Sequence, residues 1–414
     1  MPRPNRSTLA AGIAAGMLAI PLAVSAPANA VSGSPAADGA YAFTAKLDIG
    51  DSHRACSGVL VESRWVLTAA SCFAADPNVS LDIPAGPPAP ATKATIGRTD
   101  LTGTAGAVRD IVELVPHPDR DLVLARLSAS VGITPARLAA TPAAAGEQLR
   151  VAGYGRTADS WVPDKPHTGT FTVNAVNAGQ VTTTGNDGAA VCQGDTGGPA
   201  LRDTANGVEL IALSSRSWQA GCLGTDESVT DTGAISTRLD DVTDWIGTHV
   251  ARWTLKAHVN DNYVTPEINE TGNQQGKLRA RATTPYGWEQ YTLHTRDGGE
   301  TVSLRAEANN LWVTTENSMT GDYQGMLRAR GTATPAGWEQ YTLVPQGGQN
   351  YALKAKVNGK FVAVEHNYTG SDADLLRARS TTVTGGWERF TFQHADNFTV
   401  TGKAPAAPTP RPLD

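Results

Sequence analysis

The chain has 414 residues, which is too long for one ordinary domain and indicates two or three. Its hydrophobic content of 40% and its 42 glycines are typical of a folded, turn-rich protein and exclude a largely disordered one. The formal net charge is −6, with 40 acidic against 34 basic residues. This mild acidity argues against a nucleic-acid partner held through its phosphates.

The N-terminus has the pattern of an export signal. Arg3 and Arg6 give it a positive start, and a mostly apolar run extends over Leu9–Val24. Ala28–Ala30 then supplies the small-x-small pattern that signal peptidase cuts. The alternative is a retained membrane anchor, but this would need about 20 apolar residues, more than Leu9–Val24 provides. No later stretch is long enough to cross a bilayer. We therefore expect residues 1–30 to be a signal peptide, the protein to be secreted and extracellular, and no membrane contact.

The sequence contains four cysteines: Cys56, Cys72, Cys192 and Cys222. Four cysteines allow three pairings, and an exported chain meets oxidising conditions. A zinc site would want the close Cys-x-x-Cys or His spacing, which this sequence lacks. The pattern favours disulfides, and no metal or other cofactor is predicted.

Short runs of Val, Ile, Leu and Thr, broken by Gly, Pro, Asn and Asp, characterise residues 31–250. Runs at 108–115, 122–127, 148–152 and 208–213 are examples. This spacing predicts an all-β barrel or sandwich. Near the end of the region, the apolar residues at 239, 242, 245 and 246 follow helical spacing, so we predict a closing helix within 237–246.

The remainder is repetitive. Leu-Arg-Ala-Arg occurs at 278–281, 327–330 and 376–379, and Gly-Trp-Glu begins at 287, 337 and 386. In each copy an aromatic residue lies two positions after this Glu, and the period is 49 to 50 residues. Three units of short strands with a fixed period predict a threefold β-trefoil over 251–399. The Pro-rich segment 400–414 is predicted to be a disordered tail.

These repeats resemble the fascin-like β-trefoil modules, whose signature combines Leu-Arg-Ala-Arg with Gly-Trp-Glu. One large apolar residue per repeat suits a threefold core, so we assign Trp288, Trp338 and Trp387 to the core. The arginines of Leu-Arg-Ala-Arg are interpreted as a solvated strand face. A sugar site would instead use loop asparagines: Asn260, Asn262, Asn309 and Asn310. A polysaccharide is thus a candidate partner of the module.

Three segments of 31–250 resemble the trypsin-like serine proteases. They are Cys56–Cys72, which ends Thr-Ala-Ala-Ser-Cys, Asp121–Leu127, and Cys192–Pro199, which contains Gly-Asp-Thr-Gly-Gly-Pro. Gly153-Tyr-Gly and Ser217-Trp support the match, in the order that the family has. The resemblance implies an all-β chymotrypsin-type double β-barrel with a C-terminal helix, followed by the β-trefoil. It also implies the disulfides Cys56–Cys72 and Cys192–Cys222.

The resemblance places Ser71 at the position of the catalytic histidine, Asp121 at that of the aspartate and Thr196 at that of the nucleophilic serine. In such a triad the histidine takes the nucleophile's proton and the aspartate orients the imidazole. A serine hydroxyl is not a base near neutral pH, and an internal threonine has no terminal amine to activate it. Loss of the histidine or serine costs on the order of 10⁶ in rate, or roughly 8 kcal/mol. His53 and His117 are the candidates by sequence for a substitute base.

Other parts of the machinery are implied as well. Gly194 and Thr196 would supply the backbone N–H groups of an oxyanion hole. Asp195 is the residue that in this family pairs with a free amino terminus, and cleavage after Ala30 would expose Val31 for that ion pair. The alternative is that Asp195 is simply a buried structural partner, and the two interpretations are compatible.

The specificity pocket implied by the resemblance has Ala190 at its floor, so no acidic residue would hold a Lys or Arg side chain. Ser217 and Gln219 would form its wall, and the Gln219 side chain is expected to narrow the entrance where the family has glycine. Small apolar side chains are therefore the expected occupants.

Three functions compete. The first is a pseudoprotease that binds a peptide or protein ligand in its vestigial cleft and a glycan through the β-trefoil. The second is a serine-type endopeptidase with an unconventional or residual mechanism that uses Thr196. The third is a decoy that traps inhibitors without cleavage.

Overall fold

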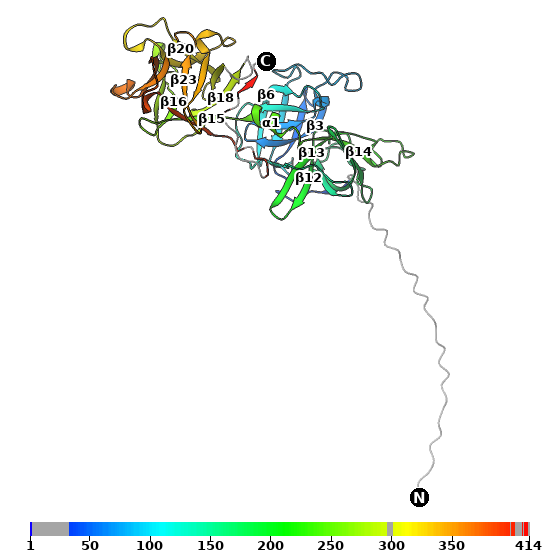
Figure 1. The fold of residues 1–414 in the computed structure, drawn as a ribbon. Coiled ribbons are helices and arrows are strands. Elements are labelled where there is room, and N and C mark those ends of the chain that lie inside the picture. Colours follow the sequence, from blue (N-terminus) through cyan, green and yellow to red (C-terminus); the bar gives the residue numbers. More distant parts are fainter. Residues whose placement is uncertain (2–32, 296–300, 398, 402–407, 409, 413–414) are drawn as a thin grey trace.

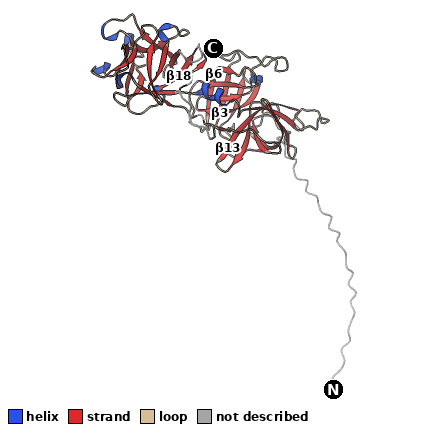
Figure 2. Cartoon of the chain, viewed as in Figure 1, coloured by secondary structure: helices blue, strands red, loops and turns tan. Residues whose placement is uncertain are grey.

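The computed structural model describes every residue except 2–32, 296–300, 398, 402–407, 409 and 413–414. Almost all of the regular structure is β-strand, gathered in two bodies that are joined near α1 (Thr243–Val250) (Figures 1 and 2). Within the described chain, no helix is long and apolar enough to span a membrane. The predicted signal peptide falls on residues whose structure is not described, apart from Met1.

The first barrel is a closed ring of six antiparallel strands. In ring order these are β2 (Thr44–Ile49), β3 (Arg54–Glu62), β4 (Trp65–Thr68), β7 (Val123–Leu127), β6 (Ala107–Pro116) and β5 (Thr92–Ile96). Valine, leucine, isoleucine and alanine fill its interior. The one-turn 3-10 helix η1 (Ala70–Cys72) follows β4 directly and is covalently tied to β3 by the disulfide Cys56–Cys72. This pairing is the one that the resemblance implied.

The second barrel is also closed, because β9 pairs with both β10 and β12. Its strands are β1 (Ser34–Pro35), β8 (Arg137–Leu138), β9 (Gln148–Gly153), β10 (His167–Asn177), β11 (Gln180–Gly185), β12 (Pro199–Thr204), β13 (Gly207–Ser217) and β14 (Gly233–Arg238). A third apolar cluster contains residues of both barrels and of α1, so the two barrels share one interface. The closing helix is confirmed, but it begins at Thr243, since 237–238 complete β14.

The C-terminal body is built from three equivalent units. Six strands pair in a ring: β15 (Trp253–Ala257), β18 (Gln290–Thr295), β19 (Val302–Ala306), β22 (Tyr341–Pro345), β23 (Asn350–Ala355) and β26 (Phe390–His394). Three hairpins lie beside the ring: β16 (Tyr263–Pro266) with β17 (Leu278–Ala282), β20 (Leu311–Glu316) with β21 (Met326–Gly331), and β24 (Phe361–Glu365) with β25 (Leu375–Ser380). A six-stranded ring with three hairpins fits the predicted β-trefoil.

Single turns of 3-10 helix recur at equivalent places in the three units. They are η2 (Gly272–Gln274), η3 (Gly287–Glu289), η4 (Gly321–Tyr323), η5 (Gly337–Glu339), η6 (Gly370–Asp372) and η7 (Gly386–Glu388). The recurring Gly-Trp-Glu motif forms η3, η5 and η7. Each of these turns leads into a strand of the ring, so the motif marks the same corner of every repeat.

The two arginines of each Leu-Arg-Ala-Arg motif have different roles: the first connects the units, which differs from the solvated face that we expected, and the second is exposed, as expected. The first arginine of each motif donates from Nε to a backbone oxygen of another repeat: Arg279 to Ala373, Arg328 to Gln275 and Arg377 to Gln324. The second forms an ion pair within its own hairpin: Arg281 with Glu267, Arg330 with Glu316 and Arg379 with Glu365. The motif recurs because each copy makes the same cross-repeat contact.

The assignment of the repeated tryptophans to the core is wrong. Trp288 and Trp338 are 38% and 36% exposed, and Trp387 is half-buried. The fully buried aromatics are instead those two positions after each Glu: Tyr291, Tyr341 and Phe390. The 3-10 turn formed by Gly-Trp-Glu carries the tryptophan outside the barrel, whereas the following strand turns its aromatic inward.

The loop asparagines proposed for sugar binding have structural roles in two repeats. The side-chain amides of Asn260 and Asn309 donate to the carbonyl oxygens of Ala280 and Ala329, at 2.7 and 2.8 Å. Their Oδ1 atoms accept bonds from the backbone two residues ahead. These bonds close the tight turn that precedes each hairpin, so the two side chains are committed to the fold.

Buried ion pairs and the C-terminal tail connect the two bodies. Arg252, just after α1, pairs with Glu62 of β3, and both side chains are almost fully buried. The tail, predicted to be disordered, is ordered in its described parts. Val400 bridges to Leu138, and β27 (Arg411–Pro412) pairs in parallel with β18. The tail therefore contacts first one body and then the other.

Candidate functional site

A cleft of about 630 Å³ in the first body is lined by all three predicted catalytic positions, Ser71, Asp121 and Thr196. These residues lie far apart in the sequence. The fold brings them together from η1, the β6–β7 connection and the β11–β12 connection, so all three border the same space.

Ser71 is fixed by its neighbours in η1. Ala70 and Cys72, on either side, are buried, and the disulfide to Cys56 ties this turn to β3. The Ser71 backbone N–H donates to Asp121 Oδ1 at 2.7 Å, and its Oγ donates to Oδ2 of the same carboxylate at 3.0 Å. The serine therefore contacts the aspartate directly, without an imidazole between them.

Asp121 has a further partner that the sequence did not reveal. Ser215 Oγ donates to its Oδ2 at 2.6 Å, so the carboxylate accepts three hydrogen bonds. The ladder between β13 and β14 is interrupted by a register shift between Ser214 and Arg216, which leaves Ser215 out of register. A bulge of this kind re-aims a side chain, here onto Asp121.

Thr196 lies in a tight loop in which the following position, 197, admits only glycine. Gly197 has φ +83°, and a Cβ there would lie 2.1 Å from Thr68 Oγ1 and 2.3 Å from the carbonyl oxygen of Ser57. Ser57 N in turn donates to Thr196 O at 2.9 Å. The Thr196 hydroxyl itself has no hydrogen-bond partner among the described residues, so no base is positioned to take its proton.

The two backbone N–H groups predicted to form an oxyanion hole are free of protein acceptors in the described chain. Gly194 and Thr196 both line the cleft, and neither backbone N–H donates to a backbone or side-chain oxygen in the described chain. The carbonyl of Gly194 points away toward β3, because Ser57 Oγ donates to it at 2.9 Å. The loop thus keeps two N–H donors available to a ligand atom.

Asp195 is a buried carboxylate that lacks a cationic partner among the described residues. It is 4% exposed and accepts hydrogen bonds from Gly155 N and Cys192 N at 2.8 and 2.9 Å. Burial raises its pKa to about 7, because desolvation outweighs these two bonds. Val31, the predicted partner, lies outside the described residues, so the ion pair stays a prediction.

The residues predicted to form a specificity pocket do not line the cleft. Ala190 is buried against the disulfide between Cys192 and Cys222, which is the second predicted pairing. Ser217 Oγ donates to the carbonyl oxygen of Val191.

The narrowing of the pocket entrance by Gln219 stays a prediction. The backbone of Gln219 has φ +64°, and its Oε1 accepts a hydrogen bond from Arg156 Nη2 at 2.7 Å. The Gln219 side chain is therefore held against Arg156, which lines the cleft.

The two histidines considered as substitute bases occupy different positions. His117 stacks edge-on against Trp245, with ring centroids 4.9 Å apart, and burial lowers its pKa. Its Nδ1 accepts a bond from Asp119 N at 3.1 Å. His53 is exposed and borders the cleft, but within the described chain its ring makes no hydrogen bond to either Asp121 or Thr196.

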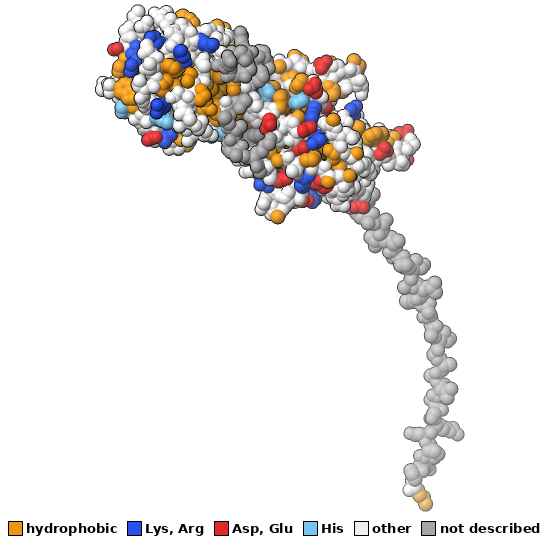
Figure 3. All heavy atoms as spheres, in the orientation of Figure 1, with side chains coloured by type: hydrophobic (Ala, Val, Ile, Leu, Met, Phe, Trp, Pro, Cys, Tyr) orange, Lys and Arg blue, Asp and Glu red, His pale blue; other side chains and the backbone are white. Residues whose placement is uncertain are grey.

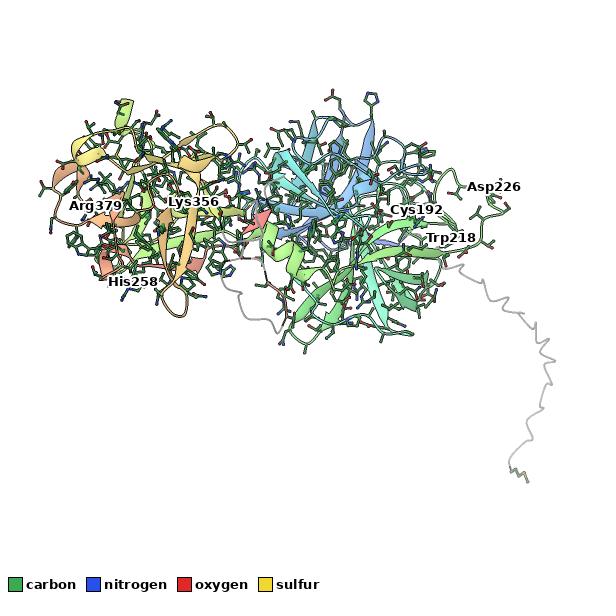
Figure 4. All side chains as sticks on the ribbon, turned by 45° about the horizontal axis from the view of Figure 1, so that its top comes forward. Cys192, Trp218, Asp226, His258, Lys356 and Arg379 are labelled. Atoms are coloured by element: carbon green, nitrogen blue, oxygen red, sulfur yellow. A yellow bond between two sulfur atoms is a disulfide. The ribbon has the colours of Figure 1, made fainter. Side chains whose placement is uncertain are left out.

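Sequence reasoning missed a group of cleft residues that the fold collects from separate strands and loops: Arg54, Arg156, Trp161, Ser215 and Arg216. No local motif distinguishes them, because each is adjacent to the cleft only through long-range packing. Figure 4 shows that the neighbouring Cys192 and Trp218 lie on the side of this body that faces away from the C-terminal one.

The double barrel and this constellation define the architecture of a chymotrypsin-type protease. A family model described as trypsin matches residues 30–246, which is more than half of the chain, and the chain belongs to that family.

Individual relatives cover the same region. The chain is 30% identical over 193 residues to serine protease SP24D of Anopheles gambiae, covering 42% of this chain and 68% of that one. It is 27% identical over 224 residues to snake venom serine protease 3 of Protobothrops jerdonii, covering 47% and 78%. Among solved structures, mouse neuropsin is 22% identical with a TM-score of 0.42, over 53% of this chain and 98% of that one.

Proposed function

We propose that this protein is a secreted trypsin-like serine protease homologue that has lost catalysis and acts by binding. Ser71 and Thr196 stand at the catalytic histidine and serine positions, with Asp121 as the remaining triad member. The observation that carries the proposal is the direct bond from Ser71 Oγ to Asp121, at 3.0 Å, in the place where an imidazole would be oriented. The two disulfides and the predicted signal peptide support an extracellular location.

The chemistry of the site explains why activity should be lost. A serine protease needs a group that accepts the nucleophile's proton and later donates it to the leaving amine. Serine and aspartate around Thr196 cannot perform both steps near neutral pH. Residual acceleration of about 10³- to 10⁴-fold from binding and the oxyanion donors would leave turnover far below that of a working protease.

The alternative is an active serine-type endopeptidase with an unconventional mechanism. The observation that favours it is the exposed His53 at the edge of the cleft that contains Thr196. Imidazole is the side chain best suited to general-base work near neutral pH, and a surface residue can move when a ligand binds. This alternative requires His53 to approach the Thr196 hydroxyl.

A labelling experiment separates the two functions. The protein is incubated with a fluorophosphonate probe and with casein, beside the Thr196→Ser single variant and the Ser71→His, Thr196→Ser double variant. We expect no labelling or cleavage by the natural sequence and a gain of both in the double variant alone. Labelling of the natural sequence that disappears in His53→Ala would establish the alternative instead.

We further propose that the β-trefoil is a carbohydrate-binding module. Its support is the exposure of Tyr286, at 73%, next to Trp288, with the equivalent Trp338 also exposed. Aromatic faces bind sugar rings, and the visible face of this body mixes hydrophobic side chains with Lys and Arg (Figure 3).

Binding to insoluble polysaccharides tests this second part. The Tyr286→Ala, Trp288→Ala variant is compared with Trp218→Ala, which removes a comparably exposed ring from the first body. We expect retention on at least one polysaccharide that falls several-fold only in the first variant. Equal retention of both variants would count against the proposal.

A further inference from the structure

The cleft has a charge opposite to that of the whole chain. The protein carries an excess of acidic residues, yet three arginines border the cleft, namely Arg54, Arg156 and Arg216. Asp121 is the one carboxylate among its lining residues, and three hydroxyl or amide groups already donate to it. Within the described chain none of the three arginines forms an ion pair with a carboxylate. The cleft therefore has an uncompensated positive charge.

Arg156 is the most informative of the three, because it is 8% exposed. Its Nη2 donates to Gln219 Oε1 at 2.7 Å and to Thr225 Oγ1 at 3.3 Å, and both acceptors are neutral. Its Nε is buried and has no partner in the described chain. A buried guanidinium without a counter-charge is costly, so an anion bound beside it would recover part of that cost.

The backbone of Arg156 lies next to the loop that carries the two free N–H donors. Its backbone N donates to Gln193 O at 2.9 Å, and a Cβ on Gly194 would lie 2.8 Å from the Cα of Gly155. Arg156, Gly194 and Thr196 therefore line the same cleft from adjacent segments of the chain. In an active protease such donors stabilise a transient oxyanion, whereas without a catalytic base they can hold a stable carboxylate.

The other two arginines extend the site. Arg54 Nη1 bridges the carbonyl oxygens of Cys72 and Ala74, at 2.9 and 2.7 Å, which fixes its guanidinium at the cleft near Ser71. Arg216 is exposed and borders the cleft from β13. The exposed ring of Trp161 lies over Arg156, with 5.4 Å between the guanidinium carbon and the ring centroid, and forms an apolar wall.

From these contacts we propose that the vestigial cleft is a carboxylate-binding groove for an acidic peptide segment. The proposal rests on the proposed loss of catalysis and names the class of ligand for the same site. One carboxylate of the peptide lies against Arg156 and the N–H groups of Gly194 and Thr196, and Arg216 takes a second. The carboxylate at the first position is either the peptide's C-terminal group or an Asp or Glu side chain.

Fluorescence anisotropy with the full chain, expressed in a secreting host, tests this groove. Three fluorescein-labelled alanine-based hexapeptides serve as probes: one with a free C-terminal carboxylate, one amidated with two internal glutamates, and one amidated with two internal lysines. We expect both acidic peptides to bind at least about tenfold more tightly than the lysine peptide, with affinity that falls as the salt is raised from about 0.05 to about 0.5 M. The ranking of the two acidic peptides identifies which carboxylate occupies the site.

Substitutions locate the binding. Arg156→Gln and Arg216→Gln should each weaken acidic-peptide binding about tenfold. Arg109→Gln, on β6 and outside the cleft lining, is the matched control and should change it less than about twofold. If Arg156→Gln does not fold, peptide binding by Arg216→Gln still tests the proposal, because Arg216 is exposed.

The groove would be overturned by a lysine peptide that binds as tightly as the acidic ones, or by no binding of any peptide at about 1 mM. Acidic-peptide binding that is unchanged in Arg216→Gln would do the same. Mass spectrometry of the peptides afterwards keeps this test separate from the proposed function. Cleaved peptide refutes the loss of catalysis, whereas intact peptide without a charge preference refutes the groove alone.

Discussion

Adding two residues ahead of Val31 should make the protein lose stability as the pH rises from about 5 to about 8. The reason is the buried Asp195, whose carboxylate has two backbone donors but no cation among the described residues. In a chain that begins at Val31, the ammonium group is three residues ahead of β1 in the sequence, and β1 pairs with β10 of the second barrel. The extension would move that charge away from Asp195.

The magnitude follows from the pKa of Asp195. Burial raises it from 3.8 to about 7, so the folded state holds this proton more tightly than the unfolded state. The stabilising effect of the proton is complete below the unfolded pKa and is lost as the pH rises toward the folded pKa. Each pKa unit corresponds to about 1.4 kcal/mol, which gives about 4 kcal/mol in full and about 2.5 kcal/mol between pH 5 and 8.

Urea unfolding at the two pH values measures this difference. The chain that begins at Val31 is compared with the same chain preceded by Gly-Ser, and each is also made with Asp195→Asn. We expect the extended chain to lose about 2.5 kcal/mol on going to pH 8, the Val31 chain to lose much less, and Asp195→Asn to remove the difference.

Two outcomes would refute this reasoning. If the extended and unextended chains show the same pH dependence, the amino terminus does not reach Asp195. If the pH dependence of the extended chain persists in Asp195→Asn, another group is responsible for it. The first outcome would make the predicted ion pair between Val31 and Asp195 wrong, and the second would make the raised pKa of Asp195 irrelevant to the pH dependence.

Two further substitutions test the contacts that hold the molecule together. Glu62→Gln leaves the buried Arg252 without its counter-charge, so the free energy of unfolding should fall by about 3 to 5 kcal/mol. Urea denaturation measures this change, and a fall of less than about 1 kcal/mol would contradict a buried ion pair. Gly197→Ala forces a Cβ against Thr68 and should lower the melting temperature sharply. Gly39 has φ +79° and open space around it, so Gly39→Ala should lower the free energy of unfolding by only about 1 kcal/mol. Similar melting temperatures for the two variants would refute the steric argument.

Motif-level features of the fold were predictable from the sequence. The double barrel and both disulfides followed from a resemblance that spans the whole of the first body. The repeats identified the threefold C-terminal body, because a fixed period with recurring motifs implies equivalent units. The side-chain orientation within each repeat was not predictable in the same way. Trp288 and Tyr291 are only three residues apart, yet Trp288 lies in a 3-10 turn and is exposed, whereas Tyr291 lies in the strand that follows and is buried.

The candidate site also has features that the sequence did not predict. Ser215 contacts Asp121 because the register between β13 and β14 shifts between Ser214 and Arg216, and no pattern in the sequence predicts this shift. The contact of Gln219 with Arg156 was not predictable either, because the two residues are 63 positions apart and Gln219 has a positive φ. Both contacts join residues far apart in the sequence, which strand periodicity does not resolve.

The sequence by itself determined which chemical groups are available at the catalytic positions. The presence of Ser71 and Thr196 in place of histidine and serine is a property of the residues, and the absence of a base at that position follows without any coordinates. The tertiary structure decided which groups meet there. Arg54, Arg156 and Arg216 come from separate segments and share one cleft only because two closed barrels pack together, and the burial of Arg156 beside neutral partners is a consequence of that packing.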